Sequence, residues 1–352
     1  MTDVLYRIID ANFNRGREAL RVMEEYCRFG LNNPTLSAQA KQCRHQLCQS
    51  MKGIDPQKRL LNRDVDGDVG RELKVEGQLQ RQSLEDCFTA AAKRASEALR
   101  ALAESIQTID PAISTMMEKI RFEVYALEKK IALFACAKLK LEAVRLYVLI
   151  NVNNREDEQE SLDLAKICID NGADCLQLRA KDICDSSLLN LAQKFTTLCK
   201  ESGVVSIIND RTDIAVLADA DGVHLGQDEI PVSYARQLAK RPFIVGVSTH
   251  SLDELRHAID SGCDYVGIGP AFASPTKPRL DVSGLGYIKQ AVSILEQSGV
   301  FHVAIGGINS QNIPSLLEVG VKAVAISSAV SDSENPANSC NTLKNTLLNA
   351  AE

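Results

Sequence analysis

Tryptophan is absent from the 352 residues, and aromatic side chains make up only 5% of the chain. Few rings are therefore available to stack on bases, which argues against a protein that binds single-stranded nucleic acid. The net charge is -6 and no long run of like charge occurs, so a broad basic surface is lacking as well. We expect no nucleic-acid partner.

Long apolar runs and cysteine pairs are also missing. No uninterrupted apolar segment could span a bilayer, and 1-MTDVLYRIIDANFNR-15 has neither an apolar core nor a small-residue cleavage pattern. The eleven cysteines include no Cys-x-x-Cys pair, so a zinc site or a disulfide framework is not expected. These absences predict no membrane partner and a reducing, cytoplasmic location.

The two halves of the chain have different residue patterns. Residues 1 to about 140 contain little Gly or Pro, and apolar side chains recur at helical spacing in 15-RGREALRVMEEYCRF-29. The pattern returns once, in 94-RASEALRALAES-105, which indicates two similar helices in a bundle. We predict an all-α helical bundle domain over residues 1–128 and a second domain over residues 129–352.

Short β-branched segments alternate with helical stretches after about residue 144. Near-continuous apolar strands separated by amphipathic helices are typical of a parallel sheet. The pattern predicts an α/β fold, a closed (β/α)8 TIM barrel, whereas an open doubly wound sheet would be expected to have a Gly-rich turn that 149-LINVNNRED-157 lacks. The candidate strands are residues 144–151, 173–180, 204–210, 222–226, 244–249, 265–270, 302–307 and 323–329.

Polar residues gather where these strands end, and barrel enzymes place their sites at the carboxyl ends of strands. In 173-ADCLQLRAKD-182, strict alternation puts Gln177, Arg179 and Lys181 on one face of the second strand. Two cations and an amide suit a phosphate or a diphosphate. The alternative is a polar edge whose charges form surface salt bridges.

Carboxylates follow the next two strands, at Asp210 and within 226-GQDE-229. Carboxylates at neighbouring strand ends, beside a phosphate site, are typical of Mg²⁺ binding, because water and the substrate complete the metal's shell. For Asp210 alone, capping of the next helix is an equally good explanation. Ser248, after the fifth strand, either caps a helix or bonds a ligand.

A second candidate anion site lies at the last two strands. The segments 305-IGGIN-309 and 326-ISSAV-330 offer glycine amides and serine hydroxyls, and barrels often bind a phosphate there. The glycines could instead serve only a tight turn. The long segment 269-GPAFASPTKPRLD-281 is expected to form a lid. With no activated nucleophile, two anion sites predict a transferase that works by positioning and electrostatics.

These motifs resemble those of thiamine phosphate synthase, over residues from about 144 to 345. The resemblance implies the joining of 4-amino-5-hydroxymethyl-2-methylpyrimidine diphosphate to 4-methyl-5-(2-phosphoethyl)thiazole by a dissociative, Mg²⁺-dependent reaction that gives thiamine phosphate and pyrophosphate. The alternative is a thiazole-phosphate-binding isomerase or a regulatory barrel without transferase activity. The motifs are 177-QLRAK-181, 209-ND-210, 222-GVHLGQDE-229, 246-GVSTH-250, 265-YVGIGPAFASPTK-277, 305-IGGI-308 and 327-SS-328.

The resemblance also implies roles for single residues, with small molecules as the partners and a homo-oligomer left open. Mg²⁺ would be held by Asp210 and Glu229, although the family commonly has Asp at the second position, so Asp228 is the alternative ligand. The pyrimidine diphosphate would contact Gln177, Leu178, Arg179, Ala180, Lys181, Asn209, Ser248 and Lys277. The thiazole phosphate would contact Ser274, Pro275, Thr276, Gly307, Ser327 and Ser328.

The first half resembles a helical domain that is sometimes fused ahead of this synthase, through 5-LYRIIDANFNRGREALRVMEEYCRF-29 and 59-RLLNRDVDGDVG-70. Some members of that family look like hydroxymethylpyrimidine phosphate kinases. No Gly-x-x-x-x-Gly-Lys-Ser/Thr loop occurs here, and a purely structural or oligomerisation bundle is the alternative. The candidate phosphate contacts in this half are Arg15, Arg17, Arg63 and Arg71.

Overall fold

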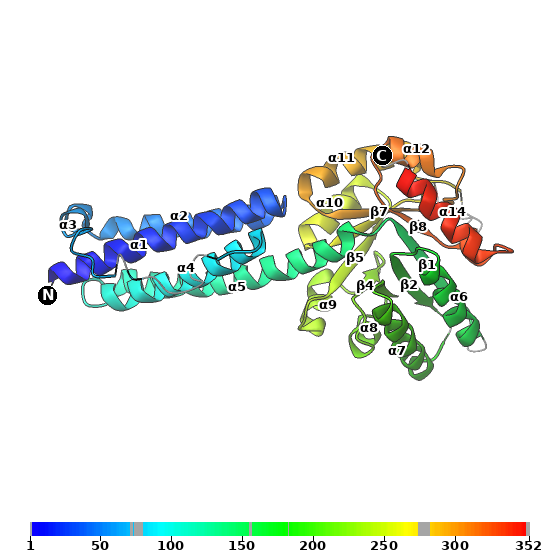
Figure 1. The fold of residues 1–352 in the computed structure, drawn as a ribbon, viewed down its shortest axis with the longest axis horizontal. Helices are drawn as coiled ribbons and strands as arrows, with labels where there is room; N and C mark the ends of the chain where they lie inside the picture. The colour runs from blue at the N-terminus through cyan, green and yellow to red at the C-terminus, as the bar shows by residue number, and fades with distance from the viewer. Residues whose placement is uncertain are drawn as a thin grey trace. The chain divides into compact units, whose positions relative to one another are not determined.

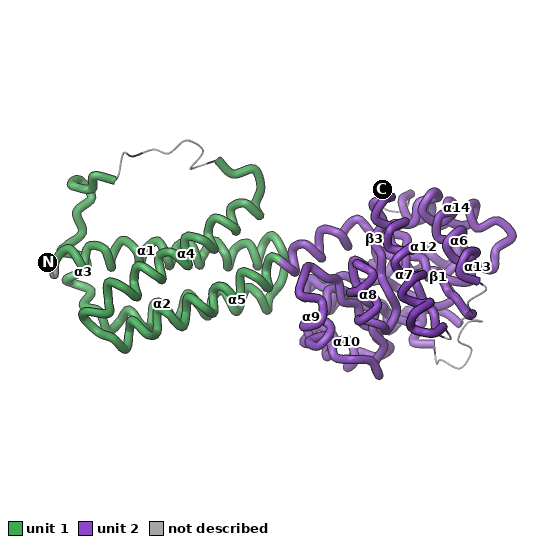
Figure 2. The backbone as a smooth tube through the Cα atoms, turned by 90° about the horizontal axis from the view of Figure 1, so that it is seen from below, with its two compact units in different colours: residues 1–132 green, residues 133–352 purple. Residues whose placement is uncertain are grey.

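The computed structural model describes residues 2–70, 73, 80–154, 157–181, 183–273 and 282–349. The chain divides into two compact units, residues 1–132 and residues 133–352 (Figure 2). Among the described residues, no helix combines the length and the apolar character that a membrane crossing requires.

Unit 1 is built from helices. The repeated sequence pattern lies in α1 (Thr2–Glu25) and α4 (Leu84–Ile106), which pack along one another. The Cβ of Ala98 lies 3.5 Å from where a Cβ on Gly16 would stand. Side chains of Asn33, Asp55 and Ser83 accept backbone N–H groups and so fix where three of the helices begin. The helices are α1 (Thr2–Glu25), a π-helical turn (Tyr26–Gly30), α2 (Pro34–Ser50), a 3-10 turn (Met51–Gly53), α3 (Pro56–Leu61), α4 (Leu84–Ile106) and α5 (Pro111–Glu142), whose last residues belong to unit 2.

Unit 2 is a closed barrel of eight parallel strands in sequential order (Figure 1), as the sequence predicts. The strands are β1 (Leu146–Val152), β2 (Cys175–Ala180), β3 (Val205–Asn209), β4 (Gly222–Leu225), β5 (Ile244–Thr249), β6 (Tyr265–Ile268), β7 (Phe301–Ile305) and β8 (Val324–Ile326). The helices are α6 (Glu158–Asp170), α7 (Asp185–Glu201), α8 (Thr212–Leu217), α9 (Val232–Ala239), α10 (Leu252–Ser261), α11 (Gly284–Ser298), α12 (Ile313–Glu318), α13 (Ser328–Ser331) and α14 (Pro336–Asn349).

Alternation along each strand separates two environments. In β2, Leu176 and Leu178 join the hydrophobic layer between the strands and the outer helices, whereas Gln177 and Arg179 face the barrel interior. The interior is apolar toward the amino ends of the strands, where the last turns of α5 also pack. That lower cluster contains Ala137, Leu141, Val144, Tyr147, Cys175, Val205, Ile207, Ile244, Tyr265, Val303, Ala323 and Ala325.

Three aspartates join neighbouring strands at the amino ends. Asp174, Asp221 and Asp264 directly precede β2, β4 and β6, and each accepts a backbone N–H from the strand before it. Each also pairs with a cationic side chain, so its buried or partly buried carboxylate is both hydrogen-bonded and charge-balanced. The backbone donors are Leu146 at 2.9 Å, Ser206 at 2.9 Å and Val245 at 2.7 Å, and the cations are Lys344, Lys140 and Arg236.

Candidate functional site

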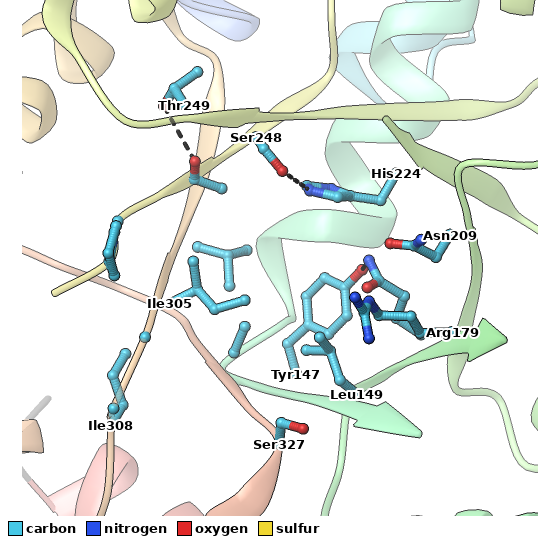
Figure 3. Close-up of a pocket in the computed structure, with 18 of the residues that line it drawn as sticks. Tyr147, Leu149, Arg179, Asn209, His224, Ser248, Thr249, Ile305, Ile308 and Ser327 are labelled. Atoms are coloured by element: carbon cyan, nitrogen blue, oxygen red, sulfur yellow. Dashed lines mark hydrogen bonds between the residues drawn. The ribbon is translucent and has the colours of Figure 1, made fainter. Parts of the chain in front are cut away.

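A cavity of about 160 Å³ opens at the carboxyl ends of the strands (Figure 3). The residues predicted to hold two different anions face this one cavity, although they come from five strands or their ends. Those that line it are Gln177, Arg179, Asn209, Ser248, Gly307, Ser327 and Ser328.

Other predicted residues occupy different positions. The side chains of Leu178 and Ala180 pack in the outer hydrophobic layer, so a ligand in the cavity could meet these residues only through the main chain. Lys181 is exposed, one residue past the end of β2. Ser274, Pro275, Thr276 and Lys277 lie outside the described residues, as does most of the predicted lid.

Asn151, at the end of β1, connects the two predicted anion sites. Its side-chain Nδ2 donates to Ser327 Oγ at 2.7 Å, and its Oδ1 accepts from Arg179 Nη1 at 3.4 Å. Arg179 is half-buried, so its charge is less screened than that of a surface side chain. The guanidinium is thereby held toward the same cavity as the Ser327 hydroxyl.

The carboxylates of Asp210 and Glu229 lie close enough to interact. Burial and the negative charge of Asp210 raise the pKa of Glu229, and Lys181 counters this. Asp210 does not cap α8, because the residue at the cap position is Arg211 and no side chain accepts a bond there. Two mutually repelling carboxylates fit a hard divalent cation, which would relieve that repulsion.

A network of polar side chains lies one layer deeper than Arg179. Gln177 Nε2 lies 2.8 Å from Tyr147 Oη, which lies 3.0 Å from Tyr265 Oη. Tyr265 Oη lies 2.9 Å from His224 Nδ1. His224 Nε2 lies 2.9 Å from Ser248 Oγ (Figure 3). These five residues, called the polar network below, come from five different strands.

Glycine makes room for the polar network. A Cβ on Gly246 would stand 2.1 Å from Tyr265 Cζ, so any larger residue would displace the phenol ring. Burial raises the pKa of both Tyr147 and Tyr265 well above that of a free phenol, and both hydroxyls therefore keep their protons.

The other end of the cavity has a close backbone approach. Gly307 has a φ of 61°, and a Cβ there would stand 2.3 Å from the Ala273 carbonyl oxygen. Glycine is therefore required at this position.

At the end of β5, Ser248 faces the cavity and does not cap the next helix. The capping residue is Ser251, whose Oγ accepts the Glu254 N–H at 3.2 Å.

Comparison with known proteins finds a family match in each of the two units. A family model described as thiamine monophosphate synthase matches residues 146–330, and a ThiD2 family model matches residues 7–130. The thiamine-phosphate synthase of Nostoc punctiforme is 37% identical over 333 residues, which cover 95% of this chain and 91% of that protein. The chain belongs to the thiamine-phosphate synthase family.

Other members of the thiamine-phosphate synthase family match at similar levels. The thiamine-phosphate synthase of Synechococcus sp. (strain CC9311) is 38% identical over 345 residues, covering 97% of this chain and 96% of that protein. The solved structure of thiamine phosphate pyrophosphorylase from Pyrococcus furiosus is 28% identical, with a TM-score of 0.54, and covers 61% of this chain and 99% of that one. The resemblance inferred from the motifs is confirmed.

Sequence reasoning assigned no role to Tyr147, Asn151, His224 or Tyr265, which all line the cavity of this thiamine-phosphate synthase family member. Period-two alternation in β1 would have placed Tyr147 and Asn151 on the inner face, with Asn151 at the carboxyl end. His224 and Tyr265 stand inside motifs that carry the family resemblance, but a single strand does not reveal that the two side chains meet.

Proposed function

We propose that this chain joins 4-amino-5-hydroxymethyl-2-methylpyrimidine diphosphate to 4-methyl-5-(2-phosphoethyl)thiazole, giving thiamine phosphate and pyrophosphate. The single observation that carries the proposal is the shared cavity. A guanidinium and amides face it from β2 and β3, and glycine amides and serine hydroxyls face it from the ends of β7 and β8. Asn151 bonds to both groups. Family membership supports the same reaction.

The reaction begins when the carbon–oxygen bond to the diphosphate breaks and its electron pair leaves with the diphosphate. Arg179 and Asn209 hold the departing anion, and Gln177 lies beside them at the cavity floor. The thiazole nitrogen then forms the new bond to the pyrimidinylmethyl cation, while Gly307, Ser327 and Ser328 hold the thiazole phosphate. None of these steps requires a nucleophilic side chain.

Mg²⁺ would be held by Asp210 and Glu229, with Asp228 as the alternative second ligand. When bound, the metal supplies positive charge that neutralises the diphosphate. Lys181 adds a cation to the same edge of the barrel, since its charge acts on Glu229.

An assay of pyrophosphate release and thiamine phosphate formation tests the proposal. We expect Arg179→Ala to lower kcat/KM by about 100-fold or more, because a half-buried cation facing the leaving group is lost. Arg256→Ala is the matched control, since Arg256 is an exposed side chain on α10 that pairs only with Asp253 among the residues described. Equal rates in the two variants would remove the basis of the proposal.

The alternative isomerase or regulatory barrel makes a different prediction in the same assay. Such a protein would bind thiazole phosphate without releasing pyrophosphate from the pyrimidine diphosphate. Thiazole phosphate binding by calorimetry, combined with no pyrophosphate release at any Mg²⁺ concentration, would favour that alternative.

We propose a second activity for unit 1, the phosphorylation of the pyrimidine monophosphate that would supply the barrel. The match of residues 7–130 to the ThiD2 family supports a distinct role for this unit. Arg59 and Arg17 lie 4.9 and 5.6 Å from the ring centre of Phe13, and Nε of Arg59 is buried without a hydrogen-bond partner among the described residues. Such a guanidinium is suited to a phosphate.

The other candidate arginines of unit 1 differ in their surroundings. Arg63 forms two bonds to the buried carboxylate of Asp10, at 2.7 and 3.0 Å, and so already has a partner. Arg15 is exposed, and Arg71 lies outside the described residues.

The full chain, ATP and pyrimidine monophosphate, without thiazole phosphate, would test the second activity, because the barrel then lacks its co-substrate. We expect pyrimidine diphosphate and ADP to accumulate, and Arg59→Ala to reduce both by about tenfold or more, as loss of a charged hydrogen bond predicts. Arg256→Ala again serves as the control. Absence of pyrimidine diphosphate from the unaltered chain would leave the purely structural bundle as the better explanation.

A further inference from the structure

The Gln177 amide can impose one direction on the hydrogen bonds of the polar network. The Gln177 Nε2 group can only donate, so Tyr147 Oη accepts from it and turns its own hydrogen toward Tyr265. Both phenols remain protonated, because burial raises the pKa of each well above the ordinary range. Tyr265 therefore receives one hydrogen bond and donates one.

The direction continues through the imidazole. A Tyr265 that accepts from Tyr147 has its own hydrogen free for His224 Nδ1, 2.9 Å away, and that direction puts the ring hydrogen on Nε2. Nε2–H then donates to Ser248 Oγ at 2.9 Å. Within the part of the chain that the structure describes, the Ser248 hydroxyl has no other hydrogen bond, and it lines the cavity.

We propose that His224 is a positioning residue, held by the two tyrosines as its neutral Nε2–H tautomer, so that Ser248 donates its hydroxyl hydrogen to a diphosphate oxygen of the substrate. The identity of that acceptor rests on the proposed transferase function. Diphosphate oxygens offer only lone pairs to neighbouring donors. If the hydrogen bond ran from Ser248 to His224 instead, the Ser248 hydroxyl would donate its hydrogen to the imidazole. Only oxygen lone pairs would then face the anion, which would repel it.

Gln177 sets the direction in this arrangement. A carboxylate at its position could only accept, so Tyr147 would donate to it, Tyr265 would donate to Tyr147, and His224 would carry its hydrogen on Nδ1. Gln177→Glu is therefore expected to change the tautomer of a histidine on another strand without altering any group that touches the imidazole.

Nitrogen NMR of the full chain with labelled histidine tests this directly, without substrate. The chain has five histidines, and the His224 signals are those lost in His224→Gln. We expect the Nε2–H tautomer in the unaltered protein and, once the new carboxyl group is ionised, the Nδ1–H tautomer in Gln177→Glu, with spectra recorded up to pH 9. The second variant, Gln177→Glu with Tyr147→Phe, should show no switch, because the path is cut.

Three results would overturn the inference: an Nδ1–H or doubly protonated His224 in the unaltered protein, an unchanged tautomer in Gln177→Glu at pH 9, or a switch that persists without the Tyr147 hydroxyl. Because these spectra require no turnover, they decide the arrangement of the polar network even if the chain forms no thiamine phosphate. A chain that forms no thiamine phosphate would count against the proposed function alone.

Kinetics separate positioning from a purely structural role. His224→Gln keeps a side-chain N–H that can reach Ser248, so its kcat should stay within about threefold, whereas His224→Leu and Ser248→Ala should each lose about 10- to 100-fold. The double variant should be no slower than Ser248→Ala, since His224 acts through Ser248. The positioning role would be refuted if the loss of kcat in the double variant equalled the product of the two single losses. Equal losses of kcat in His224→Gln and His224→Leu would refute it as well.

Discussion

The hydroxyl of Tyr147 lies 3.0 Å from that of Tyr265, although β1 and β6 are not neighbours in the barrel. The two strands are held together across the interior by this contact and by the ring packing around it. Both residues are almost fully buried, and their hydroxyls are hydrogen-bonded to one another and to Gln177 and His224, as buried polar groups require.

Tyr265→Phe is expected to destabilise the barrel by roughly 2–4 kcal/mol, because it removes the hydrogen bonds that Tyr265 makes to Tyr147 and to His224 Nδ1, and disrupting the hydrogen bonding of a buried group costs about 1–3 kcal/mol. Urea denaturation followed by circular dichroism measures the change. Tyr234→Phe, at an exposed side chain on α9, is the control and should change the free energy of unfolding by less than about 0.5 kcal/mol. A Tyr265→Phe protein as stable as this control would contradict the prediction.

Gly246→Ala is expected to be more damaging than its single added methyl group suggests. The new Cβ would lie 2.1 Å from Tyr265 Cζ, so the ring would have to move and lose its hydrogen bonds to Tyr147 and His224. We expect a loss of about 3 kcal/mol or more, or no folded protein at all. Gly286→Ala provides the comparison, because nothing lies within 4 Å of a Cβ at that position on α11.

The stability of the barrel should depend on pH through His302. Burial, with help from the charge of Lys322, lowers the pKa of His302 from 6.5 to about 4. The unfolded chain therefore binds a proton between pH 6.5 and pH 4 that the folded chain does not, so stability falls as the pH falls through this window. The contribution of this one residue is on the order of 3 kcal/mol across it.

Unfolding free energies of His302→Gln measured from pH 7 to pH 4 check this. The variant should lose part of the pH dependence seen in the unaltered protein, while His257→Gln, at an exposed position on α10, should keep it. Parallel pH profiles for the unaltered protein and His302→Gln would show that His302 does not contribute in this way.

The metal-ligand question can be settled by comparing three variants. If Asp210 and Glu229 hold Mg²⁺, then Asp210→Asn and Glu229→Gln should each raise the half-maximal Mg²⁺ concentration for pyrophosphate release by about tenfold or more, as loss of a ligand charge predicts. Asp228→Asn should have a smaller effect. The opposite order for Glu229→Gln and Asp228→Asn would assign the second ligand to Asp228.

Much of the fold could be predicted because the alternation of side chains along a strand can be recognised within that strand's own sequence. In β2, alternation alone placed Gln177 and Arg179 inside and Leu178 outside, and the structure agrees. The last strand candidate was too long: β8 ends at Ile326, and Ser328 already begins a helix. The pattern of small and apolar residues continued past the point where the sheet hydrogen bonds stop.

The polar network could not be predicted in the same way. Alternation reports whether a residue faces inward, but not how high it stands relative to residues on other strands. That height depends on the register between each pair of strands, such as Gln177 beside Leu149 and Gly246 beside Tyr265. Contact between Tyr147 and Tyr265 requires several such registers at once, as well as closure of the barrel.

The two faces of β2 also limit how this protein can change over generations. Deletion of one residue before Arg179 would turn the guanidinium into the layer beneath the helices and swing Leu178 into the cavity. A deletion of two residues would keep every remaining side chain on its own side. We therefore expect related proteins to differ in the length of β2 only by an even number of residues. A comparison of their sequences would show whether this parity rule holds.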